Sequence, residues 1–197
     1  TFHRRTAFLE FGIPGSDSLQ VNISEVLRRV RRLRDDFVAG TTKVTTDLGE
    51  RAISGRARLV GPNRVEVNGQ EWSARNIIIA TGSSPVIPQA WNSFKHHILT
   101  TDTLFEQETL PARMAVVGMG PIGIEMAQAL SRLGIEVVGF GRSPLFAGLT
   151  DPHVNDAATV SLTEEWPIYL GEKAELVEMN GKIHVRAGSN EVIVDSV

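Results

Sequence analysis

Apolar positions near the start of the chain recur at the spacing of one helix face: Ile23, Val26, Leu27, Val30, Leu33, Phe37 and Val38. A repeat of three to four residues is typical of an amphipathic helix, and a glycine after it is a common stop signal. The sequence therefore predicts a helix from residue 24 that ends at Gly40. Arginines on its outer face are partly offset by Asp35 and Asp36, so we interpret that face as solvated rather than phosphate-binding.

The period changes to that of strands between residues 42 and 82. The runs RAISGRARLV, RVEVNG and EWSARNIIIATG are rich in Val, Ile and Arg, and GPN and NGQ separate them. Turn residues between short strands predict an antiparallel meander. Residues 76–80 are apolar enough to predict a last strand that is buried on both faces. Residues 83–111 contain three prolines and are interpreted as a connector, so we expect one domain over residues 1–110 and a second over residues 111–197.

A strand, a glycine turn, a helix and a second strand follow the connector. Residues 114–117 are an apolar strand, residues 122–133 have a helical pattern, Gly134 is a helix stop, and residues 135–140 form the second strand. A helix-compatible stretch at residues 151–165 and three strand-like runs, AELVEMNG, KIHVRAG and EVIVDSV, complete the chain. The predicted class is α/β: a Rossmann-like βαβ nucleotide-binding domain, preceded by an amphipathic helix and an antiparallel β-meander.

The turn between the first strand and the helix fits the pattern Gly-x-Gly-x-x-Gly. Gly118 permits the tight turn, Gly120 lets the backbone approach a pyrophosphate, and Gly123 lets helix and strand pack closely. The phosphates would lie on the free N–H groups and the positive dipole end of the helix, whose first residues are Pro121 and Ile122. The sequence therefore predicts an NAD or NADP site here.

The end of the second strand bears on the choice of nucleotide. In an NAD site an acid at this end holds the ribose hydroxyls, whereas here the strand ends in Gly141 and Arg142, and Glu136 lies at its start. An arginine at this position can accept the 2'-phosphate of NADP. Arg132 and His153 are the other basic residues nearby in sequence. We therefore expect Gly141 and Arg142 to bind the nucleotide, with NADP slightly favoured on charge and NAD left open.

The composition of the chain bears on metal and redox sites and on the kinds of partner it binds. The chain has 197 residues, a net charge of -3 and no cysteine, which leaves no thiolate for a metal or a redox disulfide within it. The acidic balance and the absence of a long apolar run lead us to expect a cytoplasmic protein with no nucleic-acid or membrane partner. His96 and His97 are interpreted as loop histidines, because adjacent positions seldom converge on one ion, and no metal site is predicted.

The order of two motifs resembles a known family. The run IIIATGSSPVIP, residues 77–88, precedes the run TTDTLFEQETLPARMAVVGMGPIGIEMAQALSRLG, residues 100–134. This order resembles the pyridine nucleotide-disulfide oxidoreductases, a family of flavoproteins that includes dihydrolipoamide dehydrogenase, glutathione reductase and mercuric reductase. Residues 22–40 and the closing run EVIVDSV look most similar to the dihydrolipoamide dehydrogenase branch.

The resemblance implies roles for particular residues. Ala80, Thr81 and Gly82 resemble the turn that closes the FAD domain of the family against the flavin nucleotide. Glu125 matches a family glutamate that lies near the nicotinamide and pairs with a lysine beside the flavin. Pro121 stands where some members carry an aromatic lid over the flavin, so such a lid is not expected here. Gly123, where many NADP users of the family carry alanine, favours NAD.

The resemblance also implies an activity for a parent protein. Electrons would pass between a nicotinamide nucleotide, FAD and a dithiol or disulfide substrate, in a homodimer. The first FAD fingerprint, the redox cysteine pair and the C-terminal His-Glu dyad of the family do not occur in the sequence. We therefore interpret the chain as an internal fragment that carries the NAD(P) site and is inactive alone. The alternative is a noncatalytic nucleotide-binding or interaction module.

Overall fold

The computed structural model describes residues 2–197, which divide into two compact units. One unit consists of Thr1–Arg28 and Pro85–Val197, and the other is Arg29–Ser84. Short 3-10 helices connect the longer elements: η1 (Phe2–Phe8), η2 (Ser16–Ser18), η3 (Gly49–Arg51), η4 (Gln89–His97) and η5 (Leu104–Glu106). Each unit is described separately below.

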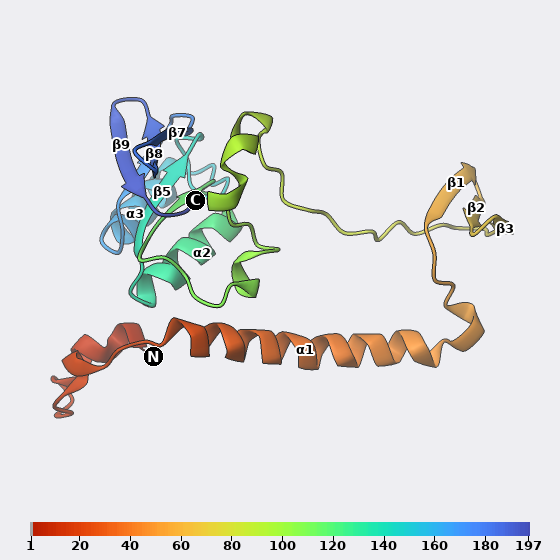
Figure 1. The fold of residues 1–197 in the computed structure, drawn as a ribbon, viewed down its shortest axis with the longest axis horizontal. Coiled ribbons are helices and arrows are strands. Elements are labelled where there is room, and N and C mark those ends of the chain that lie inside the picture. Colours follow the sequence, from red (N-terminus) through yellow and green to blue (C-terminus); the bar gives the residue numbers. More distant parts are fainter. Residues whose placement is uncertain (1) are drawn as a thin grey trace. The chain divides into compact units, whose positions relative to one another are not determined.

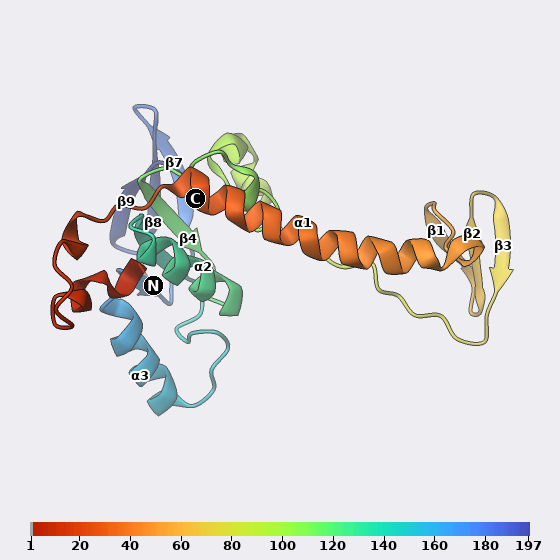
Figure 2. The same ribbon diagram turned by 90° about the horizontal axis from the view of Figure 1, so that it is seen from below.

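The larger unit contains the predicted βαβ arrangement. Strand β4 (Arg113–Val117), helix α2 (Pro121–Arg132) and strand β5 (Glu136–Gly141) follow one another, and β4 pairs with β5 in parallel. Helix α3 (Pro152–Thr163), visible in Figure 2, leads to the short strand β6 (Ile168–Leu170), which extends the parallel sheet in the order β4-β5-β6. The structure thus confirms the predicted elements and adds β6, which the sequence pattern did not indicate.

A second, antiparallel sheet closes the unit, as the three strand-like runs predict. It consists of β7 (Glu175–Met179), β8 (Lys182–Ala187) and β9 (Asn190–Val194). Asn180 and Gly181 join β7 to β8 with φ values of 53° and 70°, the positive pair that a tight hairpin requires. Beyond β9 the chain returns to the first sheet, where the Ala115 N–H donates to the Ser196 carbonyl at 3.0 Å.

The parallel sheet is buried on both faces, which explains its nearly continuous apolar strands. On one face Ala115, Val138 and Phe140 pack against the antiparallel sheet, including Ile183 and Val185. On the other face a second cluster joins the strands to α2: Leu104, Met114, Ala127, Leu130, Ile135, Val137 and Trp166. In Figure 1, α2 and the sheet of β7, β8 and β9 accordingly lie on opposite sides of β5.

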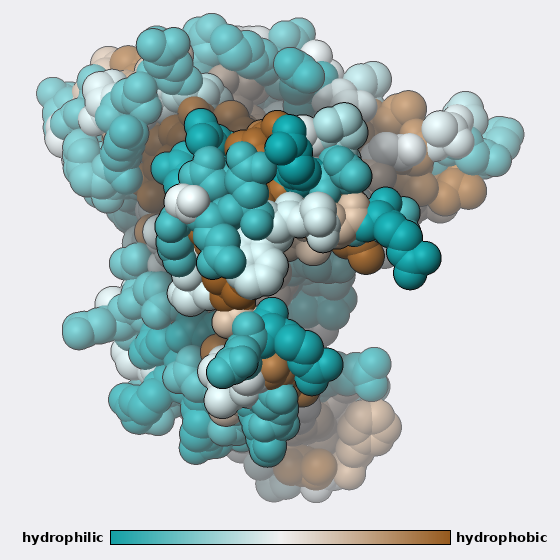
Figure 3. All heavy atoms as spheres, turned by 90° about the vertical axis from the view of Figure 1, so that its right-hand side faces the viewer, coloured by the Kyte–Doolittle hydropathy of each residue, from teal (hydrophilic) through white to brown (hydrophobic). Residues whose placement is uncertain are grey.

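The smaller unit contains the predicted meander. Strands β1 (Ala57–Gly61), β2 (Arg64–Val67) and β3 (Gln70–Ser73) pair antiparallel in sequence order. Asn68 and Gly69 make the β2-β3 turn with φ values of 53° and 81°. Figure 3 shows apolar side chains exposed at the surface among hydrophilic ones, and Trp72 is 45% exposed. The meander therefore buries little apolar surface within this unit.

The prediction of a buried strand at residues 76–80 is wrong. Residues 76–88 form no helix or strand, and Ile78 and Ile79 are 90% and 68% exposed. A strand buried on both faces needs neighbouring strands for its backbone hydrogen bonds, and the sheet of β1, β2 and β3 does not include this segment. An apolar run indicates that burial is favourable but does not supply the partner that provides it.

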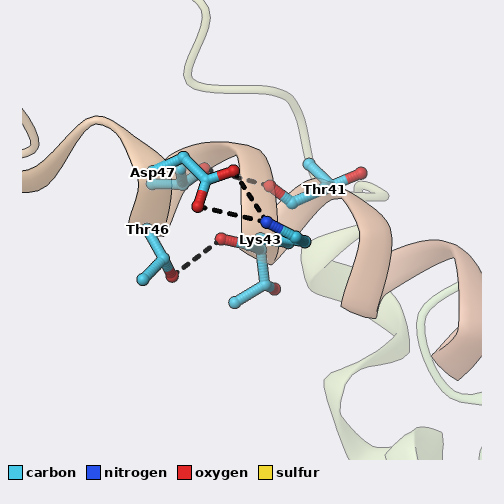
Figure 4. A network of polar contacts seen from close by, with 6 residues as sticks. Thr41, Lys43, Thr46 and Asp47 are labelled. Carbon is cyan, nitrogen blue, oxygen red and sulfur yellow. Dashed lines mark hydrogen bonds and ion pairs between the residues drawn. The ribbon is translucent and has the colours of Figure 1, made fainter.

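The predicted helix end at Gly40 is also wrong, because α1 spans Ile23–Asp47. A glycine inside a helix costs about 1 kcal/mol relative to alanine, which neighbouring contacts can offset. In the next turns the Thr41 hydroxyl donates to the Phe37 carbonyl and the Thr46 hydroxyl to the Thr42 carbonyl. Figure 4 shows the Thr46 bond and the pair that Lys43 makes with Asp47 at 2.9 Å. The helix ends before Gly49, whose φ of +57° is left-handed.

We predict that Gly40→Ala stabilises α1. Gly40 lies in the helix interior with no atom within 4 Å of an added Cβ, so alanine should raise the free energy of unfolding by about 1 kcal/mol. Urea denaturation followed by circular dichroism measures the change. Gly49→Ala is the matched control and should destabilise, because alanine disfavours its left-handed φ. Equal effects of the two substitutions would contradict this account of where the helix ends.

A second prediction concerns acid stability. Hydrogen bonds from Arg186 and then His184, at 3.0 and 2.6 Å, lower the pKa of Glu191 on β9. A lowered carboxyl pKa stabilises the fold above the unfolded-state pKa of about 4.3, and this contribution is lost as the pH falls through the folded-state value. Glu191→Gln should therefore reduce the loss of stability between about pH 5 and pH 2, measured by denaturation at a series of pH values.

The control for this prediction is Glu178→Gln. Glu178 lies on β7 of the same sheet, and its side chain makes no hydrogen bond or ion pair among the described residues. In Glu178→Gln the loss of stability at acid pH should equal that of the unmodified chain. If Glu191→Gln also loses as much stability at acid pH as the unmodified chain, the Arg186 and His184 contacts do not stabilise the fold.

Candidate nucleotide-binding site

The glycine turn after β4 is attached to the neighbouring strand. Gly118 has a φ of 111°, which a residue with a side chain rarely adopts. Its N–H donates to the Phe140 carbonyl at 2.8 Å, so the turn begins beside the end of β5. The carboxyl ends of β4 and β5 therefore lie at one edge of the parallel sheet, where ligands bind in open α/β folds.

The last glycine of the turn brings α2 against β4. A Cβ atom added to Gly123 would lie 1.7 Å from the Gly118 carbonyl oxygen, a distance that no side chain can accept. Gly120 is different, because its backbone is extended and an added Cβ would meet no atom within 4 Å. The two glycines thus have separate physical roles: Gly123 is required for packing, and Gly120 leaves open space beside the turn.

The amino end of α2 offers hydrogen-bond donors to an anion. Gly120 is the N-cap residue and supplies no side-chain cap, and the first helical bond runs from the Ile124 N–H to the Gly120 carbonyl at 3.0 Å. Pro121 has no N–H, and Ile122 is 62% exposed. A helix end of this kind carries a positive partial charge and favours phosphate. The open space at Gly120 and this uncapped end fit the pyrophosphate of a dinucleotide.

Met119, which sequence reasoning did not single out, organises the turn. Its side chain is 4% exposed and lies over β5, where an added Cβ would be 2.9 Å from Met119 Sδ at Gly139 and 3.2 Å from Met119 Cβ at Gly141. Leu170 on β6 would be 2.6 Å from the same Cβ of Gly141. The structure therefore gives Gly141 a packing role, and its contact with a nucleotide stays a prediction.

Arg142 follows β5 at the same sheet edge and is exposed. The Gly171 N–H reaches the carbonyls on either side of it, Gly141 at 2.9 Å and Ser143 at 3.3 Å. Glu136 lies at the opposite end of β5, where it pairs with Arg113 at 3.0 Å. The end of β5 near the glycine turn thus carries an arginine whose backbone is fixed.

Arg132 and His153, the other basic residues nearby in sequence, have different surroundings from Arg142. Arg132 is at the carboxyl end of α2, where Glu165 binds its guanidinium at 2.7 and 2.8 Å and raises its pKa. The structure therefore places it at the helix end remote from the glycine turn. His153 is in the first turn of α3, where its N–H donates to the capping carboxylate of Asp151 at 2.8 Å.

Glu125 and the Ala80-Thr81-Gly82 segment belong to different units of the structure. Glu125 is exposed on α2, and its side chain makes no hydrogen bond or ion pair among the described residues. Ala80, Thr81 and Gly82 are exposed in a segment without regular structure, where Gly82 has a φ of 70°. The contact of these three residues with FAD stays a prediction.

The described residues also bear on metal binding and on membrane insertion. Across residues 2–197, no group of three or more His, Cys, Asp or Glu side chains is placed to hold a metal ion. His96 and His97 lie in η4 with their ring centroids 4.1 Å apart. No helix in the described part of the chain has the length and apolar character that crossing a membrane requires.

The parallel sheet, the glycine turn and the helix that follows it have the arrangement of the α/β fold found in FAD- and NAD-binding proteins. Residues 8–197 match the model of the family described as pyridine nucleotide-disulphide oxidoreductase. The match covers nearly the whole chain, so the chain belongs to this family. Its predicted membership is thereby confirmed.

Relatives with assigned names agree with this membership. Mercuric reductase from Bacillus cereus is 34% identical over 154 residues, which is 76% of this chain and 24% of that protein. Glutathione reductase from Burkholderia cepacia is 41% identical over 50% of the chain and 22% of its own length. Dihydrolipoyl dehydrogenase from Thermus scotoductus is 39% identical over 43% of the chain and 18% of its own length. The chain thus spans about a quarter of the first of these relatives.

Solved structures show the same fold. LpdA from Mycobacterium tuberculosis superposes with a TM-score of 0.75 and 21% identity, over 99% of this chain and 45% of that protein. The HOCl-induced flavoprotein disulfide reductase RclA from Escherichia coli gives a TM-score of 0.74 with 20% identity, over 90% of this chain and 42% of that one. At such identities the likeness establishes the fold.

We predict opposite outcomes for alanine at two glycines of the turn. Gly123→Ala should destabilise the larger unit by several kcal/mol, because α2 must move away from the Gly118 carbonyl. Gly120→Ala should change stability little, because its Cβ enters open space from an extended backbone. Thermal denaturation of both variants compares the two effects. A stable Gly123→Ala variant would rule out the close helix-strand packing described above.

Proposed function

We propose that this chain carries the nicotinamide-nucleotide site of an FAD-dependent disulfide oxidoreductase. The observation that supports it most is the open turn at Gly118, Gly120 and Gly123 beside the uncapped amino end of α2. When bound, the nicotinamide would supply hydride chemistry, that is, the two electrons with which a flavoenzyme reduces a disulfide to a dithiol. The residues of this chain would bind the nucleotide, orient it and exclude water around its phosphates.

Each part of the site has a task in this proposal. The backbone N–H groups of Ile122 and Gly123 and the dipole of α2 hold the pyrophosphate, and Gly120 allows its close approach. Arg142 binds the 2'-phosphate of NADP, which makes NADP the slightly favoured nucleotide and leaves NAD as the alternative. Glu125, exposed on α2, lies near the nicotinamide ring.

The wider activity is proposed for the protein in which this site works. We propose a cytoplasmic homodimer that binds FAD, in part through Ala80, Thr81 and Gly82, and acts on a dithiol or disulfide in the manner of dihydrolipoamide dehydrogenase. Mercuric reductases match a larger share of the chain, so mercuric ion is a second candidate substrate. The absence of cysteine from these 197 residues favours one alternative, a nucleotide-binding module without redox activity of its own.

Calorimetric titration of the chain with NADH and NADPH in parallel tests the proposal. The unmodified chain should bind both nucleotides, NADPH more tightly. Arg142→Ala should weaken NADPH about tenfold or more, as expected for the loss of a charged hydrogen bond to phosphate, and change NADH little. Equal effects on the two nucleotides would show that Arg142 is not at the ribose.

Two control variants make the titration specific. Gly120→Val should abolish binding of both nucleotides with the fold retained, because its side chain fills the open space at the turn. Arg75→Ala removes an exposed arginine from the smaller unit and should leave both affinities unchanged. Unaltered binding by Gly120→Val would place the nucleotide elsewhere and refute the site.

A further inference from the structure

We propose that Asn155 is a positioning residue for nucleotide discrimination, because it fixes the loop of residues 142–150 that carries Arg142. This inference rests on the proposed nicotinamide-nucleotide site. It concerns a residue on α3, outside the glycine turn and outside the strand end that sequence motifs identify. The loop connects β5 to α3 and begins with Arg142 itself.

The first attachment of the loop is made by the Asn155 side chain. Its Oδ1 accepts a hydrogen bond from the Phe146 N–H at 2.9 Å, and both residues are buried, with 7% and 1% of their surfaces exposed. A buried backbone N–H requires a partner, and here the partner is a side chain from a different element. The Phe146 carbonyl in turn accepts from the Leu149 N–H at 2.7 Å, which closes the loop on itself.

The second attachment joins the loop to the glycine turn. The Ala147 N–H donates to the Met119 carbonyl at 2.9 Å, next to the residue that Asn155 holds. Ala147 has a φ of 50°, a conformation that residues with a side chain adopt rarely. A strained residue of this kind persists where its surroundings fix it, and the two adjacent hydrogen bonds do so here. The loop is therefore held in one position relative to the turn.

The third attachment lies at Arg142. The Gly171 N–H reaches the carbonyls of Gly141 and Ser143, and the Ser143 hydroxyl accepts from the Leu145 N–H at 3.1 Å. The Arg142 side chain itself is exposed and long, so its distance to a bound 2'-phosphate depends on where this backbone is held. Between Arg142 and Phe146 the loop has no other side-chain support from α3 among the bonds of the described residues.

Through these attachments, Asn155 on α3 affects the preference of the site between NADP and NAD. Asp151 caps α3 through the N–H groups of His153 and Val154, so the helix begins directly where the loop ends. Without the Asn155 oxygen the buried Phe146 N–H has no acceptor, and the loop must open to water to satisfy it. Opening frees residues 144–149, beyond the bonds that Gly171 makes on either side of Arg142, so the loop no longer limits where the Arg142 side chain lies. The pyrophosphate contacts at α2 remain in place.

The test compares Asn155→Leu with the unmodified chain by titration with NADPH and NADH. Leucine matches the shape of asparagine and lacks the acceptor. The ratio of the two dissociation constants should shift about tenfold toward NADH, with NADH affinity nearly unchanged. The Arg142→Ala variant and the Arg142→Ala/Asn155→Leu double variant should have the same ratio, because the two residues act through one contact. Additive effects would overturn the inference.

Thr163→Ala is the matched control, because it also removes a hydrogen bond from α3, the one to the Thr159 carbonyl at 2.7 Å, and leaves the loop alone. Its nucleotide ratio should stay unchanged. Hydrogen exchange gives a readout on the unmodified chain, which also serves if Asn155→Leu does not fold. Adenosine 2',5'-bisphosphate should protect residues 143–150 more than 5'-AMP does, and equal protection would overturn the inference.

The outcomes separate this inference from the proposed function. If the unmodified chain binds neither NADH nor NADPH, the nicotinamide site itself is refuted. If it binds them and Asn155→Leu keeps the original ratio, the site stands and the positioning role of Asn155 is refuted. A shift of the ratio in Asn155→Leu, absent in Thr163→Ala and not added to that of Arg142→Ala, supports both.

Discussion

The close approach of α2 to the end of β4 is the constraint on which the site depends. A Cβ atom at Gly123 would fall 1.7 Å from the Gly118 carbonyl oxygen, so the helix can sit there only without a side chain. That contact directs the amino end of α2 toward the sheet edge, where the turn is bonded to β5 through Gly118 and Phe140. The free N–H groups of α2, the positive end of its dipole and the open space at Gly120 therefore lie together at this sheet edge.

A second layer of packing holds this arrangement. Met119 occupies the room that Gly139 and Gly141 leave on β5, and its carbonyl binds the loop after Arg142 through Ala147. The sheet beneath is buried by α2 on one face and by the antiparallel sheet on the other, which makes it a firm support. The position of Arg142 is thus determined by contacts from several elements. The chain belongs to the pyridine nucleotide-disulphide oxidoreductases, a family that uses nicotinamide nucleotides.

Helix α1 and residues 76–80 show what the period of apolar residues does not predict. The apolar positions of α1 have helical spacing, as predicted, yet Leu33 and Phe37 are 43% and 80% exposed, and Leu27 is the buried residue of that helix. Residues 76–80 are likewise apolar, but the prediction that they form a buried strand is wrong. Hydrophobic patterns report which surfaces favour burial, whereas burial itself requires a partner surface in contact.

Local physics in the sequence determined the βαβ order, the antiparallel meander, the Asn-Gly hairpins and the glycine turn, because each depends on period, turn conformation or the absence of a Cβ within a few residues. Tertiary structure decided the length of α1, the addition of β6, the packing role of Gly141 and the pairing of Arg132 with Glu165. It also brought Asn155 to Phe146. These contacts join elements that are far apart in the sequence. Local sequence patterns therefore cannot predict which of these residues lie within contact distance.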